Sequence, residues 1–463
     1  MPRQAHNHRF EILPEVYRVG EAIRKAGGRP ILVGGWVRDV LLGITHRQDY
    51  DIEVFGLPMG RLRNILARVG PVHSVGRHFG VLKLKTAGAE YDIGVPRRES
   101  NIGKGHRGFL VQPDPNMRFE DAAARRDFTI NAMGYAFLED VLLDPFGGER
   151  DLRERILRHV GPAFGEDPLR VLRAMQFAGR FELRIVEETL AVCRAQDLDE
   201  LPRERIWVEF RKLLLQAARP SRGLSYAPEL GVLRTLPELR AVYEAPAQRV
   251  QSPWTFTLAM LDRAAALRSG EAAQDRVLMT AALCHRMGGP AEGAADAGLA
   301  GREAIVGQFL ARLTNEAAFV QAVLTVLADL ETPQRLYERR ADVRPGEIRR
   351  LSLRHSLPFL LRAARAHHEA QHAGAAFDAA AWLEAQARAL EVWAQPPQPL
   401  LLGRHLLERG MVPGPDIGEW VRAAFERQLD GEIATLEQAL AWLERQRATG
   451  AALPRAAAGG GEP

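Results

Sequence analysis

Residues 32–56 constrain the fold more than any other part of this sequence. The run LVGGWVRDVLLG (32–43) is followed by QDYDIEVFG (48–56). The first run predicts a short apolar strand, a Gly-Gly turn and an amphipathic helix, and the second predicts a strand that begins with two aspartates. This order of elements predicts a mixed α/β domain at the N-terminus.

The Gly-Gly turn is the first candidate site. Gly34 and Gly35 allow a phosphate to approach the backbone closely, and Arg38 on the first helical turn can reach the same phosphate. A Gly-Gly turn before a helix is, by itself, usually only a turn. Its meaning therefore depends on the residues that come after it in the chain.

Two aspartates at the start of the next strand supply that context. Asp49 and Asp51 are two residues apart, so a strand points both carboxylates to one face and Tyr50 to the other. Two like charges held together favour a cation between them, and oxygen ligands suit Mg²⁺. A lone pair of this kind is more often a solvated strand end, but a phosphate turn beside it indicates phosphoryl transfer. Asp92, in the strand YDIGV, is either a third carboxylate on this face or a strand-edge residue.

The rest of the chain divides into a mixed part and a helical part. A helix with Ile12, Val16, Val19 and Ile23 on one face ends at Gly27-Gly28. Strands are expected at 30–33, 50–55, 79–85, 91–95, 133–137 and 141–143. After Glu149 the alternation disappears and helical spacing continues to the end. We expect four domains, at residues 1–148, 149–235, 236–335 and 336–463.

Breaks in the pattern mark the connecting segments. Residues 97–117, between Pro96 and Arg118, are basic and contain glycine, so we expect a mobile loop there. Pro202 and Pro220 punctuate the first helical part, residues 288–301 are expected to form a loop, and 396–399 form a second break. The tail RAAAGGGEP is of low complexity and is expected to be disordered.

Composition excludes several classes and leaves others open. Apolar residues make up 46% and charged residues 26%, as in ordinary globular proteins, and 62 Lys+Arg against 58 Asp+Glu give a charge of +4, which permits a nucleic-acid partner without demanding one. Two cysteines, Cys193 and Cys284, cannot build a zinc or disulfide framework. A polar N-terminus and the lack of an apolar run of about 20 residues predict a cytoplasmic protein that does not span a membrane.

The pattern VGGxVRDxxLG…DxD resembles the nucleotidyltransferase domain of class II tRNA CCA-adding enzymes and bacterial poly(A) polymerases, in the DNA polymerase β superfamily. Four further segments resemble family motifs in the expected order: RRDFTINAM (125–133), DPFGGERDLRERILRHVG (144–161), EDPLRVLRAMQFAGRF (166–181) and RERIWVEFRKLL (203–214). The resemblance covers about residues 30–215. It implies an α/β nucleotidyltransferase head of polymerase β type (residues 1–148), followed by an all-α neck that holds the base-reading helix (149–235), a degenerate HD-like body (236–335) and a C-terminal region that engages RNA (336–463).

The resemblance also implies roles for single residues. Asp49 and Asp51 would hold Mg²⁺ for catalysis. Nucleotide binding would fall to Gly34, Gly35, Arg38, Arg126, Asp127, Asp167, Arg170 and Arg173. Arg125 is either a phosphate contact or a salt-bridged helix end, and Asn131 is either a cap or a ribose contact. Gln176 stands where the family often has Arg, which puts one contact in doubt.

The segment EDPLR supports a chemical argument for base selection. Asp167 and Arg170 share one face at the start of a helix, and Asp accepts hydrogen bonds whereas Arg only donates them. Cytosine and adenine each present an amino donor beside a ring acceptor, whereas guanine and uracil present the reverse. A mismatch of this kind costs roughly 1–3 kcal/mol per group. Asp167 before Pro168 is also a standard helix cap, and Glu166 could share that role.

Together with this preference for C and A, the resemblance implies addition of C and A to the 3′ end of tRNA, with CTP and ATP as substrates. The alternatives are an enzyme that adds only CC or only A, a poly(A) polymerase, or a non-catalytic RNA-binding protein. The segment between Pro96 and Arg118 is not obviously truncated, which mildly favours full CCA addition by the resemblance.

Two segments of the helical half carry further resemblances. Residues 252–290 resemble an HD phosphohydrolase domain, but Phe256 stands where its first His is expected and Arg286 follows His285 in place of Asp. We therefore expect a degenerate copy in which His285 is a lone histidine and no phosphohydrolase activity remains. Residues 398–443 resemble a C-terminal module that engages RNA. Its arginines either contact RNA phosphates or lie on ordinary solvated helix faces; they are Arg404, Arg409, Arg422 and Arg427.

Overall fold

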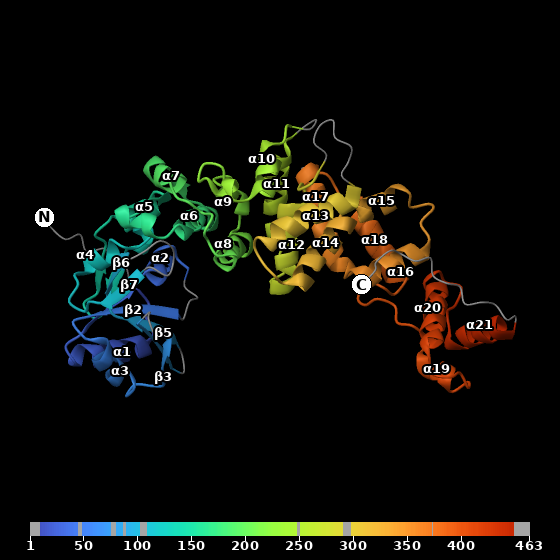
Figure 1. Ribbon diagram of the computed structural model, residues 1–463, viewed down its shortest axis with the longest axis horizontal. Coiled ribbons are helices and arrows are strands. Elements are labelled where there is room, and N and C mark those ends of the chain that lie inside the picture. The colour runs from blue at the N-terminus through green and yellow to red at the C-terminus, as the bar shows by residue number, and fades with distance from the viewer. Residues whose placement is uncertain are drawn as a thin grey trace. The chain divides into compact units, whose positions relative to one another are not determined.

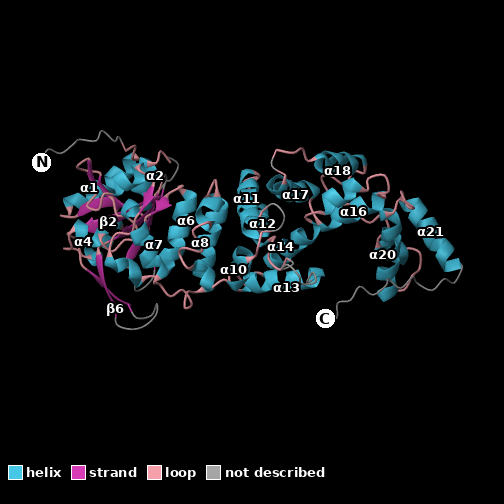
Figure 2. Ribbon diagram, turned by 90° about the horizontal axis from the view of Figure 1, so that it is seen from above, coloured by secondary structure: helices cyan, strands magenta, loops and turns pink. Residues whose placement is uncertain are grey.

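The chain forms two compact units, residues 1–237 and 238–463. The computed structural model describes residues 10–44, 49–75, 80–86, 89–101, 109–247, 251–289, 298–372 and 374–448. Within these ranges the named strands all lie in the first unit, and the second unit is helical (Figures 1 and 2). The boundary at Pro237 lies close to the boundary expected after residue 235, whereas the finer division into four domains stays a prediction.

A seven-stranded sheet forms the centre of the first unit. Its strands run in the order β3-β4-β5-β2-β1-β8-β9. The bounds are β1 Arg29–Val33, β2 Asp49–Phe55, β3 Val72–Val75, β4 Val81–Lys85, β5 Glu90–Gly94, β8 Gly134–Ala136 and β9 Val141–Leu143. All neighbours are antiparallel except β2 and β5, which run parallel.

Tyrosines mark the face of this sheet that is buried under helices. Tyr50 of β2 and Tyr91 of β5 are stacked with their ring centroids 5.7 Å apart. Helix α1 (Pro14–Lys25) packs against β1 and against α3 (Met59–Leu66), and its Val16, Val19 and Ile23 are buried. Because strand side chains alternate, the aspartates beside the tyrosines point to the opposite face.

The expected helix and six expected strands are confirmed to within two residues where the chain is described, but the segment after Pro96 is not a loop. Strands β6 (Arg97–Asn101) and β7 (Phe109–Pro113) form an antiparallel hairpin, while residues 102–108 lie outside the described part. These two segments are short, and one is strongly polar, so alternation did not reveal them. Backbone pairing stabilises them instead, and Arg98 forms an ion pair with Asp114 at 2.8 Å.

Helices complete the first unit beyond the sheet. They are α2 Gly35–Leu41, α4 Phe119–Ala123, α5 Gly148–Arg153, α6 Leu169–Arg180, α7 Glu187–Arg194, α8 Arg203–Gln216 and α9 Pro220–Leu224, with 3-10 turns at 129–131, 162–166 and 232–234. A short parallel pair, β10 (Ile156–Leu157) and β11 (Arg184–Ile185), lies among them and corrects the expectation that strands end near Glu149. Helices α8 and α9 begin directly after Pro202 and at Pro220, as expected.

Close packing of α6 on α9 depends on two glycines. A Cβ on Gly179 would lie 3.1 Å from the Cα of Gly223, and a Cβ on Gly223 would lie 2.3 Å from the carbonyl oxygen of Met175. Side chains there would force the helices apart, so α6 is held firmly against its neighbour.

The second unit consists of helices around separate cores. Its helices are α10 Pro237–Glu244 (which begins at the boundary), α11 Pro253–Ala266, α12 Ala272–Cys284, α13 Gly298–Ala311, α14 Ala317–Asp329, α15 Thr332–Glu338, α16 Pro345–Arg354, α17 Leu357–Gln371, α18 Asp378–Ala389, α19 Gly403–Leu407, α20 Pro415–Leu429 and α21 Leu436–Ala448. One core lies between residues 336 and 392 and another between 401 and 443, and the break expected at 396–399 separates them.

Helix α13 already begins at Gly298, inside the loop expected at 288–301. The tail expected to be disordered (455–463) lies outside the described residues. None of the described helices has the length and apolar character that a membrane span requires.

Candidate active site

Three carboxylates form a row on the open face of the sheet. Along β2 the side chains alternate, so Asp49 and Asp51 are exposed while Tyr50 and Ile52 are buried. In the parallel pairing of β2 with β5, Asp51 lies opposite Asp92. The structure thus brings together the two aspartates expected to hold metal and the possible third carboxylate.

The electrostatics of Asp51 fit a cation. Partial burial raises the pKa of the Asp51 carboxyl above its ordinary value, and the charges of Asp92 and Asp49 raise it further, while Arg126 and Lys83 oppose the rise. A divalent ion at this row would remove the repulsion, and hard carboxylate oxygens are the ligands that Mg²⁺ prefers. The donor set therefore fits a divalent cation held by Asp49 and Asp51, with Asp92 within the same row.

Two residues of this face were missed by the sequence reasoning. Lys83 of β4 lies opposite Asp92 in the antiparallel register and forms an ion pair with it at 2.8 Å. Glu53 continues the alternation of Asp49 and Asp51 along β2 and lies 3.5 Å from Arg126. The alternation could have identified Glu53, but Lys83 required the strand register, which the sequence does not state.

The Gly-Gly turn lies at the same end of the sheet as the carboxylates. Leu32 of β1 pairs with Ile52 of β2, so the chain beyond β1 approaches the start of β2. Gly34 has φ +69°, and a Cβ on it would lie 2.9 Å from Nη1 of Arg126. Glycine is therefore required there, and Arg126 stands between the turn and the carboxylate row. Nucleotide binding by Gly34 and Arg126 stays a prediction.

Arg38 is buried beside the Gly-Gly turn, where a Cβ on Gly35 would lie 3.4 Å from Nη2 of Arg38. Its side chain is 4% exposed and its guanidinium lies 4.5 Å from the ring centre of Phe181. Its Nε donates to Asp39 at 2.8 Å, and its Nη1 donates to Oδ1 of Asn131 at 2.5 Å. Arg38 is buried because the short helix α2 turns this side chain towards α6. Phosphate contact by Arg38 stays a prediction.

A buried polar chain continues from Arg38 into the neck. Asn131 donates from Nδ2 to Asp127 at 3.0 Å, and Arg173 of α6 donates to the other oxygen of Asp127 at 2.7 Å. Burial by itself would raise the pKa of Asp127, but the charge of Arg173 and the bonds from Asn131 and the Phe128 amide outweigh it, so the pKa is lowered. Asp127 and Arg173, expected to bind nucleotide, here bind each other across the head and neck. Asn131 acts as the bridge between Arg38 and Asp127.

The expected base-reading pair lies at the start of α6. Asp167 accepts from the amide of Leu169 at 3.1 Å and from Nη2 of Arg205 at 2.9 Å, so it has a capping contact and a partner on α8 that the sequence reasoning missed. Arg170 donates to the carbonyl oxygens of Ala163 and Arg125 at 2.5 and 2.7 Å. A carboxylate accepts about four hydrogen bonds and a guanidinium has five donors, so both side chains retain capacity for a base.

Three further residues, Arg125, Glu166 and Gln176, lie near the base-reading pair or on the same helix. Arg125 forms an ion pair with Glu166 at 3.0 Å, which matches the salt-bridged alternative for Arg125. Gln176, where the resemblance suggests Arg, is 1% exposed within α6 and lies away from the surface. Selection at this site would therefore rest on Asp167 and Arg170 rather than on Gln176.

His285 in the second unit is not alone, contrary to expectation. Its ring lies 4.6 Å from that of His367 on α17, and Phe256 lies against both, at 5.6 and 5.3 Å between ring centres. The Arg286 guanidinium lies 4.0 Å from the centre of the Phe256 ring. Burial lowers the pKa of His285 well below its ordinary value and that of His367 to about 4, so both imidazoles are neutral at neutral pH. The sequence reasoning missed His367 because a distant helix supplies it.

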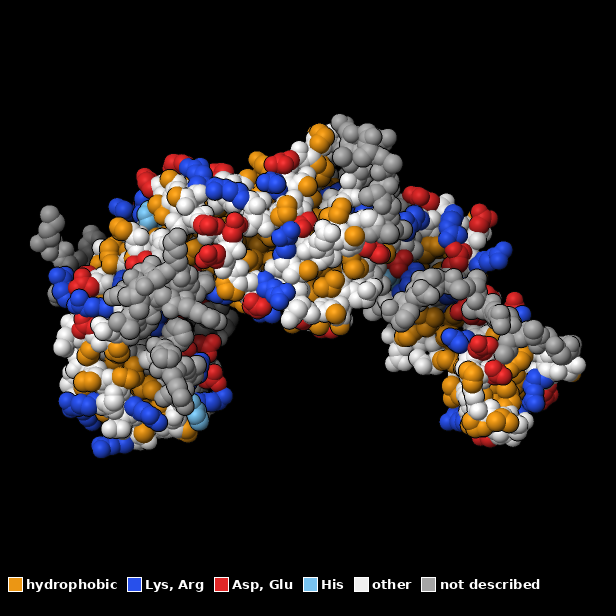
Figure 3. Space-filling view, viewed as in Figure 1, with side chains coloured by type: hydrophobic (Ala, Val, Ile, Leu, Met, Phe, Trp, Pro, Cys, Tyr) orange, Lys and Arg blue, Asp and Glu red, His pale blue; other side chains and the backbone are white. Residues whose placement is uncertain are grey.

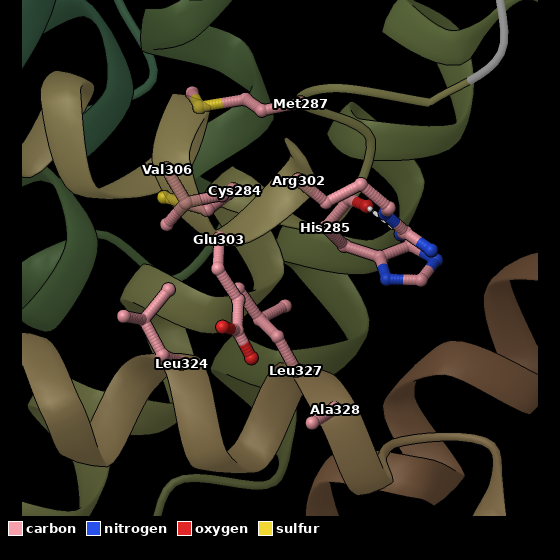
Figure 4. Close-up of a pocket in the computed structure, with 9 residues that line it drawn as sticks. All are labelled: Cys284, His285, Met287, Arg302, Glu303, Val306, Leu324, Leu327 and Ala328. Atoms are coloured by element: carbon pink, nitrogen blue, oxygen red, sulfur yellow. Dashed lines mark hydrogen bonds between the residues drawn. The ribbon is translucent and has the colours of Figure 1, made fainter. Parts of the chain in front are cut away.

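A hollow with an empty volume of about 330 Å³ adjoins this cluster. Figure 4 shows Arg302 beside His285, donating to its carbonyl oxygen at 3.0 Å, with Val306 and Leu324 farther along the wall. Its lining is mixed, and the Glu303 carboxylate points towards Leu324 and Leu327, away from His285 (Figure 4).

The C-terminal module, α19 to α21, carries the four arginines expected to meet RNA. Arg409 lies 3.7 Å from Glu444, and Arg427 pairs with Glu432 and lies 5.4 Å from the ring centre of Trp442. Figure 3 shows hydrophobic side chains on the surface of this module, and Leu407 and Val412 are among its exposed residues. These contacts describe solvated helix faces, and the RNA role of Arg404, Arg409, Arg422 and Arg427 stays a prediction.

A seven-stranded mixed sheet with a carboxylate row beside a Gly-Gly turn is the arrangement that the sequence resemblance predicted for the N-terminal part of the chain. Residues 31–158 match the family model of the poly A polymerase head domain. Residues 182–242 match the model described as the probable RNA- and SrmB-binding site of polymerase A. These matches mark two regions of the chain, residues 31–158 and 182–242, as similar to parts of poly A polymerase.

Individual relatives agree with this similarity. The chain is 40% identical over 267 residues to the multifunctional CCA protein of Stenotrophomonas maltophilia strain K279a, and 39% identical over 265 residues to that of Xanthomonas campestris pv. campestris strain B100. These matches cover 56% of the chain and 63% and 62% of the relatives, so the chain matches less than two thirds of their length.

Solved structures share the fold at lower identity. The Bacillus stearothermophilus CCA-adding enzyme in complex with CTP superposes with a TM-score of 0.68 and 22% identity, covering 95% of this chain and 99% of that one. The Thermotoga maritima CCA-adding enzyme complexed with tRNA gives a TM-score of 0.59 and 20% identity, covering 93% and 96%. At these identities the likeness concerns the fold.

Proposed function

We propose that this chain adds C and A nucleotides to the 3′ end of tRNA without a template, with CTP and ATP as substrates. The observation that carries the proposal is the row of Asp49, Asp51 and Asp92 beside the Gly34 turn. The matches to multifunctional CCA proteins support the same substrates, although they extend over only 63% and 62% of those proteins. The proposal implies a cytoplasmic protein, where tRNA is available.

In the proposed reaction, the 3′-hydroxyl oxygen of the RNA attacks the α-phosphorus of the incoming nucleotide. A new P–O bond forms, the bond from the α-phosphorus to the bridging oxygen breaks, and pyrophosphate leaves. Asp49 and Asp51 would hold Mg²⁺, which when bound lowers the pKa of the attacking hydroxyl and offsets charge on pyrophosphate. Arg126 adds positive charge between the turn and the carboxylates, where the triphosphate would lie.

Base selection depends on the start of α6 in this proposal. Asp167 would accept from the amino group of C or A, and Arg170 would donate to the adjacent ring nitrogen. Arg205 orients the Asp167 carboxylate through its 2.9 Å bond. A guanine or uracil would face both groups with the wrong polarity, which leaves buried polar atoms unpaired.

The decisive experiment supplies tRNA ending in the discriminator base, in -C or in -CC, with each labelled nucleotide in turn. Full CCA addition requires CTP incorporation on the first two substrates and ATP incorporation on the third. Products that stop at CC, products with A only, or long A tails would each replace the proposal with the corresponding alternative. No incorporation on any substrate would favour a non-catalytic RNA-binding protein.

A further inference from the structure

Three possible metal ligands meet in the second unit, far from the carboxylate row in the sequence. His285 follows the end of α12, Glu331 precedes α15, and His367 lies on α17. One ligand atom of each lies within 4.8 Å of the others. We propose that His285, His367 and Glu331 form a site for a divalent transition-metal ion such as Zn²⁺ or Co²⁺.

The geometry brings both rings and the carboxylate to one point. Nε2 of His367 lies 3.9 Å from Oε1 of Glu331, and the rings of His285 and His367 are inclined by 75°. Rings inclined in this way can direct nitrogens to a common position between them without clashing. Glu331 is the accessible member, with 53% of its side chain exposed, so an ion can enter from its side.

The unpaired nitrogens of His285 are the independent observation. The residue is 3% exposed, and among the described residues neither ring nitrogen has a hydrogen-bond partner. A buried imidazole normally pairs its polar atoms, because an unmade hydrogen bond is costly. A metal ion bound by one of these nitrogens would account for its lack of a partner.

Ring packing by itself explains less. Phe256 contacts both histidines, and Arg286 lies over the Phe256 ring, so the cluster is well packed through its faces. Packing of ring faces would be served equally by phenylalanine or leucine. It does not require two imidazoles and a carboxylate whose ligand atoms lie so close together.

The ligand types select the class of metal. Two neutral imidazoles and one carboxylate suit Zn²⁺, Co²⁺ or Ni²⁺, whereas Mg²⁺ prefers oxygen alone. The local charge is positive, because Glu331 is the single carboxylate of the group while Arg286 and Arg302 lie nearby. The remaining coordination positions therefore suit water or an anion such as inorganic phosphate, which the guanidinium groups would stabilise.

This ligand set differs from the one that the sequence pattern led us to consider lost. Phe256 and Arg286 do remove two ligands of an HD arrangement, yet His367 and Glu331 supply two others from different elements. The site does not depend on the carboxylate row or on nucleotide addition, so its failure would leave the proposed function untouched.

The test uses the full chain, stripped with a chelator and then titrated with Co²⁺ in excess Mg²⁺, which occupies the carboxylate row. We expect about one Co²⁺ per chain with a visible absorption band of nitrogen-ligated cobalt, and displacement by Zn²⁺. Glu331→Gln, at an exposed position, should weaken Co²⁺ binding roughly tenfold or more while the fold and nucleotide incorporation stay unchanged. His285→Ala and His367→Ala should abolish the band.

His372→Ala is the matched control. His372 lies on the surface after α17, with its ring 5.1 Å from that of His368, and these two could bind metal without any built site. The control should leave Co²⁺ binding unchanged. Cobalt retained at full affinity in Glu331→Gln, or lost in His372→Ala, would overturn the proposal even if the buried histidine variants failed to fold.

Discussion

The head and the second unit assemble their polar clusters in different ways. In the head, Asp49, Asp51 and Asp92 lie on two hydrogen-bonded neighbouring strands, and their face is set by alternation. In the second unit, His285, Glu331 and His367 lie on or beside three different helices. A sheet therefore fixes its site through backbone pairing, whereas a helical unit fixes it only through tertiary packing.

This difference affects how each cluster should respond to substitution. The carboxylates are solvent-accessible, so replacing one alters chemistry more than stability. The histidines are buried, so replacing one alters packing as well as any ligand. Variants that separate function from stability are therefore the most informative in each unit.

The largest expected effect concerns Asp51. Asp51→Asn removes a proposed metal ligand and should lower nucleotide incorporation on the order of 10³-fold, because metal stabilisation of phosphoryl transfer amounts to several kcal/mol and about 1.4 kcal/mol gives a factor of ten. The measurement is single-turnover incorporation of labelled CTP at saturating Mg²⁺. Asp121→Asn, on α4, is the control and should keep its activity. Full activity of Asp51→Asn would disprove the role of the carboxylate row.

The next effect concerns the joint between head and neck. Asp127→Asn leaves Arg173 without its buried partner and should lower the free energy of unfolding by about 3 kcal/mol. Urea unfolding followed by circular dichroism measures this loss, again with Asp121→Asn as control. An unchanged urea midpoint would show that the hydrogen-bonded side chains from Arg38 to Arg173 do not stabilise the contact between head and neck.

The contribution of Asp127 to stability should also depend on pH. The pKa of Asp127 is lower in the folded protein than in the unfolded chain, where it is about 3.9. Its contribution is therefore fully present above the unfolded value and is lost as the pH falls through the folded value. The stability difference between the wild type and Asp127→Asn should narrow as the pH falls below about 4, and a constant difference would contradict the assignment.

A smaller effect, of about one to two powers of ten in nucleotide discrimination, is expected at Asp167 and distinguishes it from Arg205, which holds its carboxylate. Asp167→Ala should reduce discrimination between CTP and UTP by roughly 10- to 100-fold, which corresponds to about 1–3 kcal/mol for an unpaired base edge. Arg205→Ala should reduce it less, because Arg205 only orients Asp167. The ratio of kcat/KM for the two nucleotides is the measurement. Equal losses in both variants would mean that Arg205 itself contacts the base.

Most of the head could be predicted from the sequence because its signals are local. A short apolar run located β1, alternation located β4 and β5, and two-residue spacing placed Asp49 and Asp51 on one face. The hairpin of β6 and β7 escaped prediction because β6, with the sequence RRESN, is polar throughout and shows no apolar alternation, so that only its pairing with β7 reveals it. The partner of Asp92 escaped because the register of β4 against β5 is a tertiary property.

Side-chain destinations were harder to predict than element positions. Helical spacing placed Arg38 on the first turn of α2, but packing of α2 towards Phe181 buries it. The same limit applies to His367, since nothing in the local pattern of α17 indicates that His285 lies against it. Local periodicity tells which face a residue shares, and tertiary packing decides what that face meets.

The smallest effect is expected at Lys83 and bears directly on the carboxylate row. Lys83 lies 2.8 Å from Asp92 and competes for it with any cation in the row. Lys83→Gln should therefore lower the Mg²⁺ concentration for half-maximal incorporation about two- to threefold, since an exposed ion pair of this kind is weak. Lys85→Gln is the matched control, because Lys85 pairs with Glu90 on the same two strands. A Mg²⁺ requirement that rises in Lys83→Gln would mean that Lys83 contacts the triphosphate, and that the row holds its cation through Asp49 and Asp51 without Asp92.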